Sequence, residues 1–303
     1  MLNTDHSRLF RSFATLCLAL VLSVSLAKAD MTFEQALPAA EKGDAEAEFW
    51  VGKAYFKGDG VPVDYAKAWE YYHKAAEQGN AKAQNNLASM YQTGKGVKKH
   101  LPEAAKWYRK AAEQGAALAQ TNLAIMLEEG SGVPKDIKEA AQWYEKAATQ
   151  GQVDACFRLG QLYFNGANGF EKDYAKAAKW LDKPAAAGNV VAQHLLGTLY
   201  KNGWGVPNDP NRAFNLFQSA ADMGYAPAQR DLGVFYCTGV GTKIDVVHGF
   251  KWLMLASDQG DFLATHFMSE FRGDIMAKEF HKAREMADDF KPKVAKSDPS
   301  QGK

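Results

Sequence analysis

Histidine and cysteine are the first side chains to consider for chemistry, because they bind metals and serve as bases or nucleophiles near neutral pH. The chain has seven histidines and three cysteines. The histidines include no His-Glu-x-x-His pair, and no group of cysteines and histidines has the spacing of a zinc site. We therefore predict no metal site and no cofactor.

A serine nucleophile also needs partners at fixed spacing. Penicillin-recognising enzymes combine Ser-x-x-Lys with Ser-Asp-Asn and Lys-Thr-Gly. Here Ser-x-x-Lys occurs only at Ser25, in an apolar N-terminal run, and at Ser300, in a polar tail. We attribute both to chance and predict no catalytic residue. The tripeptide Arg272-Gly273-Asp274 falls between two expected helices, so we interpret it as a connector rather than an adhesion motif.

Pairs of glycines recur in "GDGV", "GKGV", "GSGV", "GWGV" and "GVGT". A phosphate-binding loop would follow a strand and open a helix, with further glycines or Gly-Lys-Ser/Thr. None of these features is present. We therefore predict that the glycines form turns.

A repeated phrase leads from these single residues to the elements that position them. Phrases similar to Lys-Ala-Ala-Glu-Gln-Gly end at Gly43, Gly79, Gly115, Gly151, Gly188, Gly224 and Gly260. These glycines are 36 residues apart, as from 43 to 79, except for one interval of 37 from 151 to 188. Such a period indicates stacked units rather than one closed core. The expected repeats are 44–79, 80–115, 116–151, 152–188, 189–224 and 225–260.

Each repeat contains two expected helices. Helix A has small and apolar residues two, four, eight, nine and twelve positions after the glycine, which is a helical period. It should end at Gly58, Gly94, Gly130, Gly166, Gly203 or Gly239. Helix B should begin after an N-capping aspartate, with His100 as the exception. These aspartates are Asp64, Asp136, Asp173, Asp209 and Asp245.

Helix B carries a large residue eight positions before the closing glycine: Tyr71, Trp107, Trp143, Trp180, Leu216 or Trp252. These residues share a helical stripe with small residues such as Ala75 and Ala76, so we predict that they pack in the core. A carbohydrate-binding platform is the alternative. Pro184 interrupts helix B of the fourth repeat, which also holds the inserted residue. The proline makes either a tolerated kink near the helix end or a functional hinge.

The full pattern, A-x-A-x-x-x-L-G-x-x-Y followed by G-x-G-V and A-x-x-W-Y-x-K-A-A-x-x-G, resembles the Sel1-like repeat, a relative of the tetratricopeptide repeat. The resemblance covers residues 44–260. It implies an all-α fold, a right-handed α/α superhelical solenoid whose helices A line a concave binding face. Members of the family usually act as adaptors. A cysteine-rich branch, with one disulfide per repeat, is linked to binding or slow hydrolysis of β-lactams, and this chain lacks those paired cysteines. Cys156 and Cys237 lie two repeats apart, beyond disulfide reach, so we expect two buried, unpaired thiols.

The N-terminus has the order of segments of a secretory signal peptide. Arg8 and Arg11 precede an apolar run that ends in Ala27-Lys28-Ala29. We expect residues 1–29 to be cleaved after Ala29 and the protein to be periplasmic or secreted. An uncleaved membrane anchor is the alternative.

The mature chain would have no strong charge imbalance. Of 36 bases, Arg8, Arg11 and Lys28 are lost, and of 35 acids only Asp5, which leaves 33 and 34 and a net charge of about −1. This balance argues against a nucleic-acid partner. We expect no integral membrane association after cleavage, and a monomer.

Both ends of the repeat array should be capped. Residues 30–43 form an expected capping helix with Thr32 as N-cap and Gln35 completing a capping box. Residues 261–290 form a partial repeat and a last helix. The apolar face of that helix comprises Met276, Phe280, Ala283, Ala287 and Phe290. Residues 291–303 have too little apolar content to order.

The helix A face opposite the core should line the concave groove. At ~100° per residue, it contains positions three, seven, ten and fourteen after each glycine. In the first two repeats these are Glu46, Trp50, Lys53, Lys57, Lys82, Asn86, Ser89 and Thr93. The binding residues that we predict are Trp50, Lys53, Asn86, Leu118, Asn122, Ile125, Arg158, Val191, Leu195, Asp231 and Val234. Asn86 and Asn122 resemble the asparagines with which related repeat proteins hold a peptide backbone. Scattered surface residues or packing contacts between repeats are the alternative.

These patterns favour an exported, non-enzymatic adaptor that binds a protein or peptide segment in the groove. A weak hydrolase of β-lactams or peptidoglycan fragments, like that suggested for the cysteine-rich branch, is the alternative. A module that binds wall glycans is a third hypothesis, which the expected burial of most tryptophans disfavours.

Overall fold

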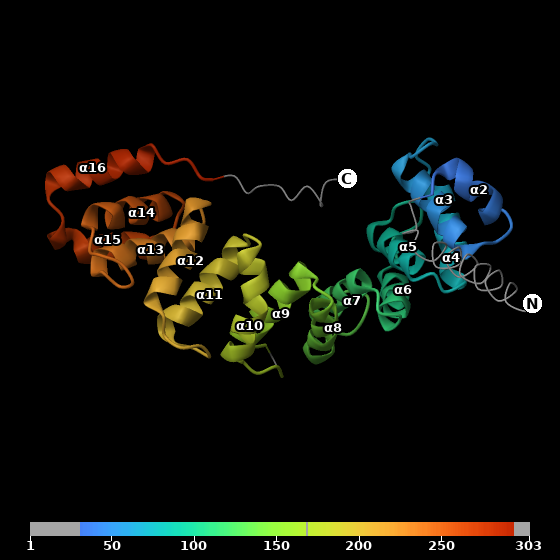
Figure 1. Ribbon diagram of the computed structural model, residues 1–303, viewed down its shortest axis with the longest axis horizontal. Helices are drawn as coiled ribbons and strands as arrows, with labels where there is room; N and C mark the ends of the chain where they lie inside the picture. The colour runs from blue at the N-terminus through green and yellow to red at the C-terminus, as the bar shows by residue number, and fades with distance from the viewer. Residues whose placement is uncertain (1–30, 168, 294–303) are drawn as a thin grey trace, which may run out of the picture. The chain divides into compact units, whose positions relative to one another are not determined.

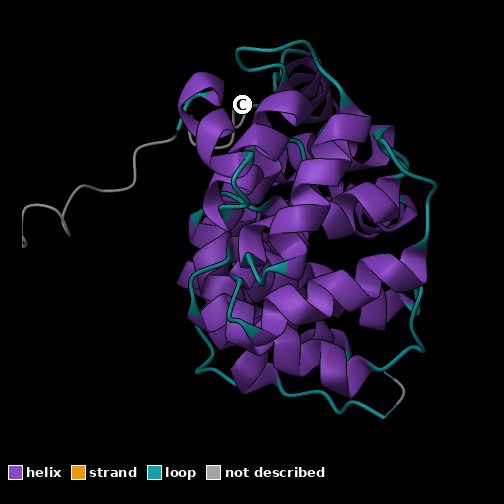
Figure 2. Cartoon of the chain, turned by 90° about the vertical axis from the view of Figure 1, so that its right-hand side faces the viewer, coloured by secondary structure: helices purple, strands orange, loops and turns teal. Residues whose placement is uncertain are grey.

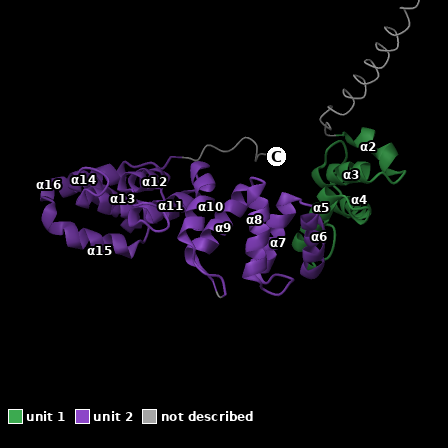
Figure 3. Ribbon diagram, turned by 60° about the horizontal axis from the view of Figure 1, so that its bottom comes forward, with its two compact units in different colours: residues 1–100 green, residues 101–303 purple. Residues whose placement is uncertain are grey.

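The computed structural model describes residues 31–167 and 169–293, and the predicted signal peptide lies outside them. In this described part every named element is a helix (Figures 1 and 2). Unit 1 covers the described residues up to His100, and unit 2 begins at Leu101 (Figure 3). The prediction of an all-α fold of helix-turn-helix repeats is confirmed. No helix in the described part has the length and apolarity needed to span a membrane.

The helices of unit 1 are α2 (Phe33–Ala40), α3 (Ala45–Lys57), α4 (Tyr65–Glu77) and α5 (Ala81–Thr93). Those of unit 2 are α6 (Leu101–Glu113), α7 (Ala117–Glu129), α8 (Ile137–Thr149), α9 (Val153–Asn165), α10 (Tyr174–Ala186), α11 (Val190–Asn202), α12 (Pro210–Asp222), α13 (Ala226–Thr238), α14 (Val246–Asp258), α15 (Phe262–Glu270), the 3₁₀ helix η1 (Phe271–Asp274) and α16 (Ala277–Asp288). Helices A are the odd-numbered helices from α3 to α13, and helices B the even-numbered helices from α4 to α14.

Local hydrogen bonds set the helix ends where the sequence predicts them. The carboxylates of all five predicted N-cap aspartates accept a backbone N–H three residues on. Thr32 and Gln35 form the predicted capping box before α2. Helix A ends at a left-handed glycine in five repeats, for example Gly58 with φ 82°. In the fourth repeat Gly166 instead has ψ 175°, because the inserted residue redirects the loop.

The second glycine of each turn allows close packing within a unit. A Cβ atom at Gly205 would lie 2.2 Å from the backbone nitrogen of Ala175 at the start of α10. Because real Cβ atoms do not approach backbone this closely, only glycine fits there. At Gly169, in the lengthened loop, the nearest atom lies 3.9 Å away, on Lys138. The glycine pairs thus serve the predicted turns.

The core differs by one position from the prediction. Trp107, Trp143, Trp180 and Trp252 are buried, but Tyr71 and Leu216 are only half-buried. The residue after each of the six is more deeply buried, at 0–1% exposure: Tyr72, Tyr108, Tyr144, Leu181, Phe217 and Leu253. This residue lies closer to the centre of the interface with helix A. At Gly52 of α3, for example, a Cβ atom would lie 2.8 Å from the Tyr72 ring.

The remaining expectations about unit 2 are met in part. Both thiols are free, with Cys156 buried and Cys237 half-buried. Helix α10 continues for two residues past Pro184, which therefore lies in its last turn. On α16, Ala283 and Ala287 are buried as predicted, but Met276, the N-cap of this helix, is 58% exposed.

Part of the tail predicted to be disordered is held in place. The backbone N–H of Lys293 donates to the carbonyl of Asp222, 2.8 Å away. The ammonium of Lys293 pairs with the Asp222 carboxylate. Residues 294–303 lie outside the described part.

Candidate functional site

The predicted binding residues lie on successive helices A of each unit. In unit 1, Trp50 and Lys53 are on α3 and Asn86 is on α5. In unit 2, the helices α7, α9, α11 and α13 carry the others: Leu118, Asn122, Ile125, Arg158, Val191, Leu195, Asp231 and Val234. Their surroundings differ, and we describe the units in turn.

Unit 1 has a pocket on the predicted face. It encloses 270 Å³ between α3, α4 and α5. Its lining residues are Phe49, Lys53, Phe56, Lys57, Tyr72, Asn86 and Ser89. We call this cavity the α3–α5 pocket. Four of its seven residues belong to the stripe that the sequence places opposite the core, and two of them, Lys53 and Asn86, are among the predicted binding residues.

The inner wall of the α3–α5 pocket is aromatic. The Tyr72 ring lies 6.0 Å from the ring of Phe49 and 6.4 Å from that of Phe56, between centroids. Tyr72 is 1% exposed, and its hydroxyl lies beside the Asn86 side chain. Burial raises the pKa of Tyr72 to about 12, so the phenol stays neutral. Oδ1 of Asn86 accepts a hydrogen bond from Nδ2 of Asn85 at 3.3 Å, and Nδ2 of Asn86 can donate to a ligand.

Lysines surround the α3–α5 pocket. Lys53 and Lys57 line it, one helical turn apart on α3. The Lys82 ammonium lies 5.5 Å from the ring centroid of Phe49, and that of Lys95 lies 5.4 Å from the ring centroid of Phe56. The seven lining residues include no carboxylate. The pocket therefore joins apolar ring faces to a cationic mouth.

Trp50 does not occupy the exposed position that the sequence predicted. It is 7% exposed, and its ring packs edge-on against Phe49 at 5.3 Å. Its face is covered by the Lys53 ammonium, 4.1 Å from the ring centroid. Trp50 also borders a second pocket of 390 Å³, next to Thr32 and Phe33 at the start of α2. The start of the capping helix thus forms a pocket with Trp50 that the periodicity alone did not predict.

On α7 and α9 of unit 2 the predicted residues have mixed surroundings. Leu118 is 59% exposed, whereas Asn122 and Ile125 are half-buried. Arg158 lies 3.7 Å from Glu128, and Glu128 also accepts a hydrogen bond from Tyr144 at 2.7 Å. Burial and the adjacent Glu128 carboxylate raise the pKa of Tyr144 above its ordinary value. Arg158 is therefore already engaged with a carboxylate.

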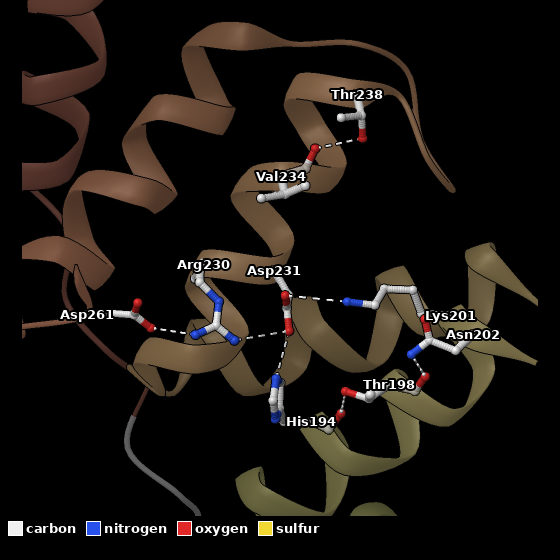
Figure 4. Close-up of polar contacts among 9 residues, drawn as sticks. All are labelled: His194, Thr198, Lys201, Asn202, Arg230, Asp231, Val234, Thr238 and Asp261. Atoms are coloured by element: carbon white, nitrogen blue, oxygen red, sulfur yellow. Dashed lines mark hydrogen bonds and ion pairs between the residues drawn. The ribbon is translucent and has the colours of Figure 1, made fainter. Parts of the chain in front are cut away.

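Asp231 on α13 is the centre of an ion-pair cluster (Figure 4). Its carboxylate lies 2.8 Å from Nε2 of His194, 3.6 Å from the Lys201 ammonium and 3.6 Å from the Arg230 guanidinium. Arg230 also donates to Asp261, the N-cap of α15, at 2.9 Å. The cluster thus links the helices A of the last complete repeats to the partial repeat.

The electrostatics of this cluster favour the ionised carboxylate. Burial by itself would raise the pKa of Asp231, whose side chain is 13% exposed. The hydrogen bond with His194 and the charges of Lys201, His194 and Arg230 outweigh burial and lower the pKa. The carboxylate is saturated by its neighbours, so the cluster holds helices together.

The apolar residues predicted on α11 and α13 are half-buried. Leu195 packs against the core cluster that includes Leu181 and Leu196. Val234 packs against the cluster of Leu253, Ala256 and Ala264. Val191 is also half-buried. Thr198 and Thr238 donate their hydroxyls to carbonyls of their own helices, as Figure 4 shows. This face of unit 2 is therefore used largely for packing between repeats.

Sequence reasoning missed the aromatic wall of the α3–α5 pocket. Phe49 and Phe56 are six and thirteen positions after Gly43, where the second repeat has Asn85 and Gln92. Two aromatic residues seven apart lie on one helix face. The fourth repeat has the same pair, Phe157 and Phe164, so the pair by itself would not have located the wall in unit 1. Tyr72 carried no signal either, since the equivalent residue in every repeat is buried.

A helix-turn-helix repeat with capped ends and turn glycines defines the class of protein as an α-helical solenoid. The model of the Sel1 repeat matches six segments: residues 45–80, 81–115, 117–152, 153–189, 190–225 and 226–261. Because these segments cover more than half of the chain, it belongs to the Sel1 repeat family.

The chain is also similar to solved structures. A Sel1 repeat protein from Oxalobacter formigenes is 38% identical, with 71% of this chain and 85% of that chain covered and a TM-score of 0.56. The protective antigen c5321 of uropathogenic Escherichia coli is 29% identical, covering 85% and 71%, with a TM-score of 0.39. Cysteine-rich protein B of Helicobacter pylori is 28% identical, covering 41% and 88%, with a TM-score of 0.34. No curated protein sequence matches the chain.

Proposed function

We propose that the protein is an exported, non-enzymatic adaptor that binds a protein or peptide segment on the helix A face of unit 1. Sel1 repeat proteins commonly serve as scaffolds for protein interactions. The observation that carries the proposal is the α3–α5 pocket, which opens on the face that the repeat pattern assigns to binding. Aromatic faces, an amide and ammonium groups in one pocket suit a peptide side chain and its polar backbone.

The size of the α3–α5 pocket suits one side chain of a peptide rather than a whole drug-sized molecule. Pockets for drug-sized molecules enclose about 300–1,000 Å³, and this one encloses 270 Å³. One side chain fits this space, while the rest of a peptide runs over the surface. Affinity then depends on a few residues around the pocket, as in other interfaces with hot spots.

The composition of the α3–α5 pocket also supports a binding role rather than catalysis. Ser89 is the one hydroxyl of serine or threonine in the lining, and the lining includes neither a histidine nor a carboxylate to act as its base. A serine without a neighbouring base is a weak nucleophile. Hydrolysis of a β-lactam by purified protein, abolished by Ser89→Ala, would contradict the non-enzymatic proposal.

Export forms the second part of the proposal, and it rests on the order of basic, apolar and small residues in residues 1–29. We expect the exported chain to begin at Asp30. Intact-mass or N-terminal analysis of the protein in the periplasm or medium tests this. An exported species that retains Met1 would contradict it.

The test of binding is affinity capture from an envelope extract with the mature chain as bait. Ser89→Trp should fill the pocket and abolish retention of the partner. Glu70→Trp, at an exposed position of α4 that does not line the pocket, is the matched control and should retain it. Circular dichroism must show native helix content for both variants. Equal retention by wild type and Ser89→Trp would remove the pocket from the proposal.

A further inference from the structure

The charges around the α3–α5 pocket are strongly one-sided. Lys53 and Lys57 line it, and Lys82 and Lys95 place ammonium groups near the Phe49 and Phe56 rings of its wall. Glu46 lies 3.5 Å from Lys82, so that one of these lysines is already paired with a carboxylate. Since the chain as a whole is nearly neutral, this concentration of positive charge is local.

The lysines are too far apart to serve a single carboxylate. Lys82 lies near the start of α5, and Lys95 follows its end. The 13 residues of α5 rise ~20 Å at about 1.5 Å per residue. Lys57, on α3, is exposed and lines the pocket. Several carboxylates along an extended segment would complement this arrangement better than one terminal carboxylate.

The aromatic wall indicates which kind of side chain would lie between the carboxylates of such a segment. The rings of Phe49, Phe56 and Tyr72 line a space of 270 Å³. This space accepts one apolar side chain, whose burial would favour binding. Charge complementarity between the lysines and the partner's carboxylates would then determine which partner binds and would increase its association rate.

We infer that the α3–α5 pocket recognises an acidic peptide segment, with an apolar side chain in the aromatic pocket and flanking Asp or Glu side chains on the surrounding lysines. The inference rests on the proposed function, since it names the partner of the same site. We infer that the carboxylates recognised by the lysines are those of Asp or Glu side chains within the peptide and not the carboxylate of its C-terminus.

The experiment uses two libraries of short random peptides, displayed against the mature full-length chain. In one library the random segment is internal, and in the other it ends at a free C-terminus. Wild type should enrich internal sequences in which Asp or Glu flanks an apolar residue. A synthetic peptide of the enriched sequence, with both ends blocked, should bind at least ten-fold more weakly to Lys57→Glu, a loss of ~1.4 kcal/mol.

Lys42→Glu is the matched control, since Lys42 is also an exposed lysine of unit 1 and does not line the pocket. It should bind the peptide like wild type. Raising the ionic strength from about 0.01 M to 0.15 M shortens the Debye length from about 30 to 8 Å, and should weaken binding to wild type more than to Lys57→Glu.

The remaining outcomes separate the inference from the proposed function. Enrichment without acidic residues, abolished by Ser89→Trp, would overturn the inference and leave peptide binding standing. Enrichment only from the library with free C-termini would replace side-chain carboxylates with the terminal one and also overturn it. Failure of wild type to enrich any peptide from either library would overturn both.

Discussion

The helix A faces of the two units use charge in opposite ways. On α3 and α5 of unit 1, lysines surround an aromatic pocket that has no carboxylate in its lining. On α11 and α13 of unit 2, His194, Lys201 and Arg230 converge on Asp231, which is nearly buried. Asn86 and Asp231 occupy the same repeat position, seven after the glycine. One repeat position therefore lines a pocket in one repeat and joins two repeats in another.

The largest expected effect is the loss of stability in Trp50→Ala. This variant tests whether Trp50 is an exposed contact residue for a partner or part of the packed interior beside the pocket. Because Trp50 is 7% exposed, its truncation should cost ~3–5 kcal/mol of the free energy of unfolding. Denaturant unfolding measures this cost. Lys57→Ala, on the same helix, should change it by less than ~0.5 kcal/mol. A cost below about 1 kcal/mol for Trp50→Ala would restore it as an exposed contact residue.

In unit 2, Asp231→Ala should destabilise by ~3 kcal/mol, because it leaves three basic side chains facing one another in a nearly buried cluster. Binding of the acidic peptide to unit 1 should not change at temperatures where the variant is folded. Chemical unfolding and peptide titration together test this prediction. Loss of binding with little loss of stability would mean that Asp231 contacts the partner.

The same cluster predicts a pH dependence. Folding lowers the pKa of Asp231 below its ordinary value of 3.8. The stabilisation is therefore complete above pH 3.8 and is lost as the pH falls through the lower, folded pKa. Asp231→Asn removes the titrating group, so its stability should decline less steeply than that of wild type below pH 3.8. Parallel acid unfolding curves would show that the cluster does not favour the ionised carboxylate.

A smaller effect concerns a side-chain hydrogen bond between repeats that is present in both units but missing in the fifth repeat, in unit 2. Gln78 donates to Glu48 at 2.8 Å, and in unit 2 Gln150 and Gln259 donate to Gln120 and Gln229 at 2.8 and 2.7 Å. Gln193 occupies the acceptor position of the fifth repeat, but Met223 stands where its donor would be. The buried Oε1 of Gln193 has no hydrogen-bond partner in the described part of the chain.

Met223→Gln should supply that donor and raise the stability by ~1 kcal/mol. Thermal unfolding measures the gain. Met223→Leu keeps the position apolar and should give no gain. If both variants change the melting temperature equally, the effect comes from packing and not from the hydrogen bond.

The periodicity of the sequence was sufficient to predict the helices and much of their order. Helix ends depend on caps within about three residues, so Asp64 or Gly58 identifies an end without knowledge of any other repeat. The candidate site was predictable only in part. Lys53 and Asn86 were placed at the pocket, but its aromatic wall combines residues of α3 with Tyr72 of α4. A stripe on one helix carries no information on which residues of the next helix complete a cavity.

The sequence by itself determined the repeat register, the all-α architecture and the stripe of helix A that turns away from the core. Only the tertiary structure decided which residues of that stripe are accessible. Trp50 is buried because Phe49 packs against it and the Lys53 ammonium covers its ring, and Asp231 is paired because His194 and Lys201 come from the preceding helix A. The reason is the range of the interactions: helix caps form between neighbours in the chain, whereas burial and ion pairing also join residues that are distant in the sequence, such as His194 and Asp231, 37 positions apart.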